Sequence, residues 1–200
     1  MDLLTTLGRT MGFSFAAGIN LYATVAILGL ASRFEWVVLP PQFKVFDNDI
    51  VIGVAIVLYL VEFVADKIPW VDSAWDALHT VIRPLGGALI AVTTMGPTSP
   101  TAEGLVALLG GSLAAGTHLS KAGTRAIANT SPEPFSNWAL SLGEDALVVG
   151  LGVVALKYPV AAAVVVVIGV LLIAVFASVI IRGLRTAWRR RAGTAVIHQS

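Results

Sequence analysis

Long apolar runs, separated by short polar segments, dominate this chain from end to end. A membrane-spanning helix needs about 20 mainly apolar residues, and four of the runs reach or approach that length. Two runs are shorter, so each of these either crosses the membrane or is a re-entrant or broken helix covered by protein. The six runs cover residues 11–32, 49–65, 85–95, 104–118, 137–156 and 160–181. The pattern predicts an all-α integral membrane protein with about six transmembrane helices, or five if one short run does not cross.

Composition supports a membrane location. Hydrophobic residues make up 56% of the 200 positions and charged residues only 12%, whereas a soluble domain carries about 25% charged residues. The length fits one membrane domain over residues 1–200. The absence of cysteine excludes disulfides and cysteine-ligated metals.

Basic residues predict the orientation in the membrane. Arginines gather after the last apolar run, in a tail over residues 182–200, and such a cluster beside a span is typical of a cytoplasmic anchor rather than of a nucleic-acid site. Six spans with both termini inside place ten basic residues in the cytoplasm: Arg9, Lys67, Arg83, Lys121, Arg125, Arg182, Arg185, Arg189, Arg190 and Arg191. Only three basic residues then lie opposite. We expect a multi-pass protein of the cell inner (plasma) membrane with a cytoplasmic C-terminus.

Two segments match each other and indicate an internal repeat. Residues 12–21 and 110–119 share six of ten positions, and residues 58–62 resemble residues 140–144. Two halves, at about 10–97 and 104–182, would each hold three spans, so the second half would be inverted, as in many secondary transporters. Asn20 and His118 would then be equivalent. The alternative is that small residues recur because they let membrane helices pack closely.

Ionisable residues lie inside the apolar runs, where they are costly and face either a cavity or a partner. Glu62 and Asp66 share one helix face, and Glu144 and Asp145 lie in the second half. The residues expected to bind a substrate or ion are Asn20, Glu62, Asp66, His118, Lys121, Arg125, Glu144 and Asp145. The alternative for the carboxylates is a structural ion pair with Lys67, Lys121 or Arg125.

A helix over residues 72–83 would place Asp72, Asp76, His79 and Arg83 on one face. Such a face is typical of an amphipathic helix at the membrane surface. It could also hold a divalent cation through Asp72, Asp76 and His79. No other cofactor is expected.

Several of these segments resemble an uncharacterised bacterial multi-pass membrane family, the domain of unknown function 4126. They lie at residues 20–24, 62–69, 71–80 and 129–137, together with His118, Lys121, Arg125, Glu144 and Asp145. The resemblance covers roughly residues 10–160. It implies a membrane location and transfers no functional role to any residue.

No nucleophile elbow, zinc-protease helix, phosphate loop or dinucleotide fingerprint is present. The sequence therefore favours a small secondary transporter or permease for an ion or small polar solute, coupled to protons or a cation through a midplane site. The alternatives are a structural or accessory membrane subunit and a metal-dependent membrane-embedded enzyme. The expected partners are the lipid bilayer, a small solute or ion and a second copy of the chain, with no nucleic acid.

Overall fold

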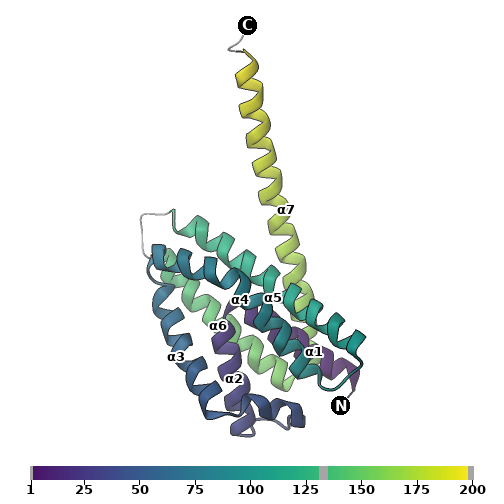
Figure 1. The fold of residues 1–200 in the computed structure, drawn as a ribbon. Coiled ribbons are helices and arrows are strands. Elements are labelled where there is room, and N and C mark those ends of the chain that lie inside the picture. The colour runs from purple at the N-terminus through teal and green to yellow at the C-terminus, as the bar shows by residue number, and fades with distance from the viewer. Residues whose placement is uncertain (1, 131–134, 198–200) are drawn as a thin grey trace.

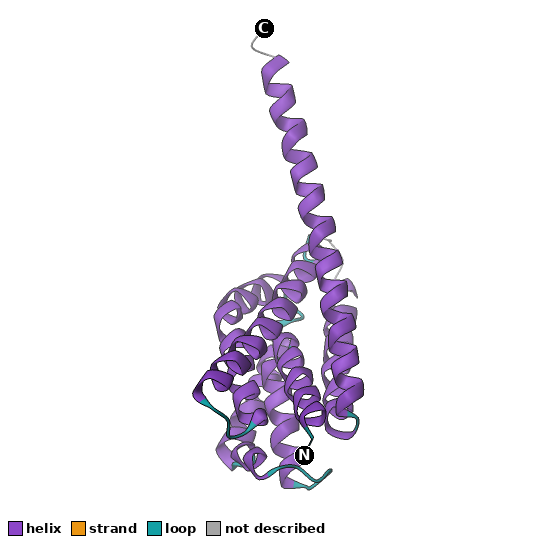
Figure 2. Ribbon diagram, turned by 90° about the vertical axis from the view of Figure 1, so that its right-hand side faces the viewer, coloured by secondary structure: helices purple, strands orange, loops and turns teal. Residues whose placement is uncertain are grey.

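The computed structural model describes residues 2–130 and 135–197, and these residues form helices and loops without any strand (Figure 1). The helices are α1 (Leu3–Ile19), α2 (Leu21–Arg33), the 3-10 helix η1 (Pro41–Phe46), α3 (Asp49–Ala65), α4 (Pro69–Met95), α5 (Pro100–Ala128), α6 (Phe135–Lys157) and α7 (Pro159–Ile197). The last helix extends far beyond the others (Figure 2).

Three helices in the described part of the chain are long and apolar enough to cross a membrane: Pro69–Met95, Phe135–Lys157 and Pro159–Gly183. Their outward surfaces carry large apolar side chains in place of charges. Leu172 on α7 is 64% exposed and Leu89 on α4 is 70% exposed. Such surfaces are stable against lipid and not against water, so the protein is a membrane protein.

The two short apolar runs are parts of long helices, so neither is re-entrant. Residues 72–83 and 85–95 belong to one helix, α4, which continues through Pro84. Membrane helices tolerate an internal proline where neighbouring elements compensate for it, and α5 lies close here because Gly111 has no side chain. A Cβ atom at Gly111 would stand 3.2 Å from the Pro84 carbonyl oxygen. Residues 104–118 likewise lie within the 29-residue helix α5, which Ser99 caps.

The first apolar run, expected as one span over residues 11–32, is broken at Asn20. Asn20 has φ −147° and ψ 102°, and its side chain accepts a hydrogen bond from the Ala23 N–H at 2.9 Å. It therefore ends α1 and caps α2. Asparagine is among the residues that cap helices best, and this local preference explains the break.

Helices α1 and α2 fold back on each other at this break. Along α1, Gly12 lies against Ala155 of α6, and Asn20 lies against Asp145, ten residues earlier in α6. Further along α2, Ile27 packs against Gly152, which lies seven residues after Asp145 in α6. The two helices thus run in opposite directions and form a hairpin with Asn20 at its tip, which we call the α1–α2 hairpin.

Helix α1 lies at the centre of the bundle and packs through small residues. Almost all of its residues from Gly8 to Ile19 are buried. At the crossing of α4 and α5, a Cβ atom at Gly110 would lie 2.7 Å from the Gly87 carbonyl oxygen. Close approach through glycine and alanine is the usual mode of helix association in membranes.

The two segments of the sequence match lie side by side and run in the same direction. A Cβ atom at Gly110 would meet the Ser14 hydroxyl at 2.9 Å, and one at Gly18 would meet Ala114 Cα at 2.8 Å. Because α1 and α5 are parallel, the inverted relation expected for these segments is not observed. The start of α1 and the far end of α7 lie at opposite ends of the bundle (Figure 1). The side of the membrane on which each end lies stays a prediction.

The bundle has two faces, which we name by their loops. The upper face in Figure 1 holds the α3–α4 junction at residues 66–68 and the end of α5. The lower face holds the N-terminus, residues 34–48 and Tyr158 between α6 and α7. The candidate site described below lies nearer the upper face.

Candidate functional site

A dense group of ionisable side chains lies inside the bundle, between the middle of the helices and the upper face. Helix α3 contributes its end, α4 its first half, α5 its second half and α6 its middle, while the tip of the α1–α2 hairpin reaches them from below. We call this group the buried charged cluster: Asn20, Glu62, Asp66, Asp72, Asp76, His79, Arg83, His118, Lys121, Arg125, Glu144 and Asp145.

Arg83 is the innermost cation of the cluster and is fully buried. Its Nη2 atom donates to Glu62 Oε1 at 2.6 Å, and its Nη1 atom donates to His118 Nδ1 at 2.7 Å. Nη1 also lies 3.6 Å from Asp76 Oδ1. Because arginine only donates, His118 Nδ1 must be the unprotonated nitrogen, and its Nε2 donates to the Asp76 carbonyl at 3.1 Å. His118 is therefore neutral in this arrangement.

His79 is fixed in a similar way. Its Nδ1 atom lies 2.7 Å from the Trp75 carbonyl oxygen, which only accepts, so Nδ1 carries the proton. Its Nε2 atom lies 2.9 Å from the Tyr22 hydroxyl. This chain of hydrogen bonds connects α4 with the first turn of α2 and anchors the hairpin tip against the cluster.

Lys121 joins the carboxylates of three helices. Its Nζ atom lies 3.3 Å from Glu62 Oε1, 3.4 Å from Asp66 Oδ2 and 3.4 Å from Glu144 Oε2. It also donates to the carbonyl of Ile19 at 3.2 Å, one residue before the helix break. The end of α1 thus contributes a backbone carbonyl group to the same site.

Arg125 lies nearer the upper face and binds the last turn of α3 to α6. It makes a two-point contact with Glu144, at 3.1 Å and 2.6 Å. Its Nη2 atom donates to Asp66 Oδ2 at 2.9 Å and its Nη1 atom lies 3.4 Å from Asp72 Oδ1. Planar two-point pairing of this kind is the strongest form of ion pair that arginine makes.

The carboxylates outnumber the cations. Six carboxylates (Glu62, Asp66, Asp72, Asp76, Glu144 and Asp145) face three basic side chains (Arg83, Lys121 and Arg125), which leaves a formal charge of −3 with both histidines neutral. The nearby Lys67 contacts Ser141 and the Phe63 carbonyl, and no carboxylate in the described part of the chain lies within 4.0 Å of it.

Five carboxylate oxygens in the cluster are buried without a hydrogen-bond partner among residues 2–130 and 135–197: Glu62 Oε2, Asp66 Oδ1, Asp72 Oδ1, Asp76 Oδ1 and Asp145 Oδ2. Those of Asp72 and Asp76 still lie 3.4 Å and 3.6 Å from Arg125 Nη1 and Arg83 Nη1. Asp145 is the clearest case, since its other oxygen only accepts from the Asn20 amide at 3.4 Å and no described basic group pairs with it within 4.0 Å. A buried carboxylate oxygen without a partner is strongly unfavourable as a bare anion. Such oxygens need a proton, water or a cation.

A cavity of about 200 Å³ leads from the upper face toward the cluster. It lies between α4 and α5, and the polar side chains in its wall are Asp72, Ser73, Asp76, Thr80, Arg125 and Asn129. Asn129 binds Asp72 at 3.0 Å and is in turn bound by Asn137 at 2.6 Å. Residues 131–134, within the segment that supports the family resemblance, lie outside the described residues.

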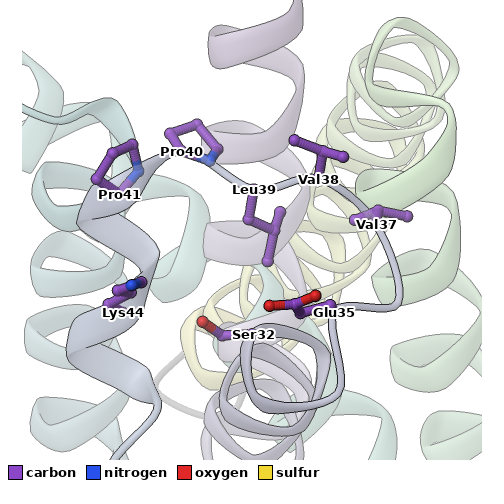
Figure 3. Close-up of a pocket in the computed structure, with 8 residues that line it drawn as sticks. All are labelled: Ser32, Glu35, Val37, Val38, Leu39, Pro40, Pro41 and Lys44. Atoms are coloured by element: carbon purple, nitrogen blue, oxygen red, sulfur yellow. The ribbon is translucent and has the colours of Figure 1, made fainter.

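A second cavity, of about 420 Å³, lies at the lower face and far from the charged cluster (Figure 3). The segment after α2 arches over the end of that helix, and Leu39 points toward Ser32 and Glu35 (Figure 3). Glu35 has a φ of 48°, in the left-handed region. Lys44 and Glu35 are the charged groups in its wall, so this cavity offers no comparable polar site.

The eight residues expected to bind a substrate or ion all lie in the buried charged cluster, although their role stays a prediction. The ion pairs proposed as the alternative are also present for Lys121 and Arg125, whereas Lys67 makes none. The sequence placed Arg83 on the polar face of a helix over residues 72–83 and outside the set expected to bind a ligand. The structure buries Arg83 in the cluster, because the helix continues through Pro84. Tyr22, whose hydroxyl contacts His79, was not among the predicted site residues. Its position two residues after Asn20 was the signal that could have identified it.

The expected metal ligands point in different directions. Asp72 faces Arg125, Asp76 faces Arg83 and His79 contacts Tyr22. Within the described ranges, no group of three His, Asp or Glu side chains is arranged to hold a metal ion. The metal site at Asp72, Asp76 and His79 stays a prediction without geometric support.

Fold and site together define an all-helical membrane protein with a polar interior. The chain belongs to the family described as domain of unknown function (DUF4126), whose pattern matches residues 7–179. No curated protein and no solved structure matches it.

Proposed function

We propose that this protein is a small secondary transporter or permease for an ion or small polar solute, coupled to protons or to a cation. The observation that carries the proposal is the formal charge of −3 in the buried charged cluster. Three basic side chains share ion pairs with five of its six carboxylates, and Asp145 has no such pair among the described residues. Ionisable groups inside a membrane protein are expensive and mark ion pathways or proton relays by default.

The excess negative charge requires neutralisation beyond the ion pairs, and protons or a bound cation can supply it. Protons can bind the unpartnered oxygens of Glu62, Asp66 and Asp145, or a cation can bind among them. Protons and cations bind reversibly, and either is released when its concentration in the adjacent solution falls. The excess negative charge of the cluster therefore favours binding without making it permanent. A purely structural ion-pair network would be closer to charge balance.

Access in this structure is from the upper face. The cavity beside Asp72 and Asp76 opens there, whereas the lower half of the bundle is filled by Phe13, Leu28 and Leu151. Exchange with the lower side would require the α1–α2 hairpin to move, since its tip contacts both Asp145 and Lys121. A broken helix at the site is the usual construction in secondary transporters.

The same geometry suggests a membrane topology. Besides the three helices that are long and apolar enough to cross, α4, α6 and α7, we infer that α3 and α5 cross the membrane, and that the α1–α2 hairpin enters from the lower side and returns to it. Arg182 and Arg185 are exposed on the far part of α7, and basic residues favour the cytoplasm. The upper face, with the cavity, then lies in the cytoplasm and the N-terminus lies outside.

The proposal is tested by cation-dependent stabilisation of the purified protein. A ligand at about 100 times its dissociation constant adds about 2.7 kcal/mol to the native state. Melting temperatures are measured against a panel of monovalent and divalent cations at several pH values. We expect one cation, or low pH, to stabilise the wild type and the matched variant Glu103→Gln, which alters an exposed carboxylate on α5. Asp145→Asn should abolish the effect. If no cation and no pH change stabilises the wild type selectively, the proposal is wrong.

A structural or accessory subunit is the second candidate, and the two-point pairing of Arg125 with Glu144 favours it. It predicts that every neutralised carboxylate damages folding. The excess-charge proposal instead predicts that Asp145→Asn folds normally and loses only cation binding.

A further inference from the structure

A third cavity, of about 320 Å³, lies between α1, α5, α6 and α7 and combines an apolar wall with one ionised end. Its walls are Phe15, Ile19, Leu140, Leu147, Gly169, Leu172 and Ile173. Its polar end consists of Glu144 and Lys121 with the hydroxyls of Thr117, Ser120 and Thr124. We call this space the lateral pocket.

The lateral pocket opens toward the lipid rather than toward either face. Leu172 is 64% exposed and Leu147 is 49% exposed, so its rim belongs to the apolar outer surface. Gly169 provides the space beside α1, because a Cβ atom there would stand 2.7 Å from the Phe15 ring. A molecule dissolved in the bilayer would therefore reach this pocket without passing through water.

The polar end of the pocket belongs to the buried charged cluster. Glu144 has the most exposed carboxylate among the ion-paired groups of the cluster core, at 15% for its side chain, whereas Glu62 is fully buried. Both ionised groups at this end are already paired: Lys121 Nζ contacts Glu62, Asp66 and Glu144, and Glu144 also pairs with Arg125 at two points. The charge that a ligand meets at this end is therefore that of the cluster as a whole. The hydroxyls of the pocket can accept hydrogen bonds, and the cluster behind them carries excess negative charge.

We propose that the lateral pocket binds an amphipathic cation from the bilayer, with its charged group at Glu144 and its apolar part along α1 and α7. The proposal rests on the function proposed above and names its substrate class. Apolar walls supply most of the affinity of such pockets, and a few placed polar groups supply the specificity. Charge complementarity excludes an anionic amphiphile of the same shape.

Binding is tested with decyltrimethylammonium, with decyl sulfonate as the anion of equal chain length. The 200-residue chain is placed in nanodiscs of uncharged lipid, and retention of the radiolabelled probe is compared with that of empty nanodiscs. We expect saturable retention of the cation and none of the anion. Equal retention of both probes, or retention no greater than in empty nanodiscs, overturns the proposal.

Two variants on neighbouring positions of α7 locate the site. Leu172→Trp places a large ring at the pocket, and Leu171→Trp, 61% exposed outside the pocket wall, is its matched control. We expect Leu172→Trp to weaken cation retention at least about tenfold, which corresponds to 1.4 kcal/mol, and Leu171→Trp to leave it unchanged. Equal retention by both variants would place the probe elsewhere and overturn the assignment.

The failure of this inference is distinguishable from failure of the proposed function. Leu172→Trp should keep the stabilisation by inorganic cations or protons, because it leaves Glu62, Asp66 and Asp145 unchanged. Stabilisation by inorganic cations without retention of decyltrimethylammonium would contradict the lateral pocket alone. Loss of the stabilisation by inorganic cations in Leu172→Trp would contradict the assignment of Leu172 to the apolar wall alone.

Discussion

Neutralising Glu62 and neutralising Asp145 should affect stability very differently, although both carboxylates lie in the same cluster. Glu62 is fully buried, with Oε1 at 2.6 Å from Arg83 Nη2 and 3.3 Å from Lys121 Nζ. Glu62→Gln therefore leaves two buried cations each with one partner fewer. Breaking a buried ion pair by removing one partner costs about 3–5 kcal/mol, and we expect the lower end because Arg83 and Lys121 keep other contacts.

Asp145 has no ion-pair partner within 4.0 Å among the described residues. Its Oδ1 atom accepts a hydrogen bond from the Asn20 amide at 3.4 Å. Asp145→Asn keeps an oxygen for that amide and removes one of three excess charges. We expect its free energy of unfolding to equal or exceed that of the wild type, to within about 1 kcal/mol, as is usual where no specific interaction is lost.

The assay is unfolding in mixed micelles by titration with sodium dodecyl sulfate at pH 7, followed by circular dichroism. Glu103→Gln, at an exposed carboxylate on α5, should shift the free energy by less than about 0.5 kcal/mol. If Asp145→Asn proves as costly as Glu62→Gln, the carboxylates are not in excess and the reasoning fails.

Three further predictions concern the fold. Gly110→Ala should lower the free energy of unfolding by about 1–3 kcal/mol, because the added Cβ atom overpacks against Gly87. Gly104→Ala on the same helix meets nothing within 4 Å and should raise the free energy of unfolding by about 0.5–1 kcal/mol. Thermal melting of both variants checks this, and equal melting temperatures would contradict the close packing. Asn20→Ala should lose about 1 kcal/mol with the helix cap, and Asn20→Ser should recover part of it in the same assay; equal losses would show that capping is unimportant. Because the chain has no cysteine, single cysteines at Leu4 and Thr186 should react with impermeant maleimide from opposite sides of the membrane, and reaction from one side would contradict the hairpin.

Much of the fold follows from the length and spacing of the apolar runs. The runs at residues 49–65, 137–156 and 160–181 each begin within two residues of the start of a helix, because long apolar segments have few alternatives to a helix in lipid. The errors concern Pro84 and Asn20. A proline that normally ends a helix is tolerated within α4, and a polar residue that a span would tolerate instead ends α1.

The sequence predicted most of the residues of the site but not the ion pairs and hydrogen bonds between them. The cost of charges in apolar runs identified Glu62 and Glu144, since that cost is a property of the residue and its surroundings. The partners depend on which helices lie side by side, and no local pattern encodes that. Arg83 was missed as a site residue for this reason: its burial depends on α4 packing against both α1 and α5, where it reaches the Gly18 carbonyl and His118.

The most direct test of the central claim is cation-driven proton movement in proteoliposomes that contain a pH-sensitive dye. With an outward proton gradient imposed, each external cation is added in turn, beside empty liposomes and liposomes with Asp145→Asn. The account predicts that at least one cation dissipates the gradient through the wild type and Glu103→Gln, and that Asp145→Asn is as tight as the empty liposomes. A wild type that is tight to every cation and to protons would contradict it.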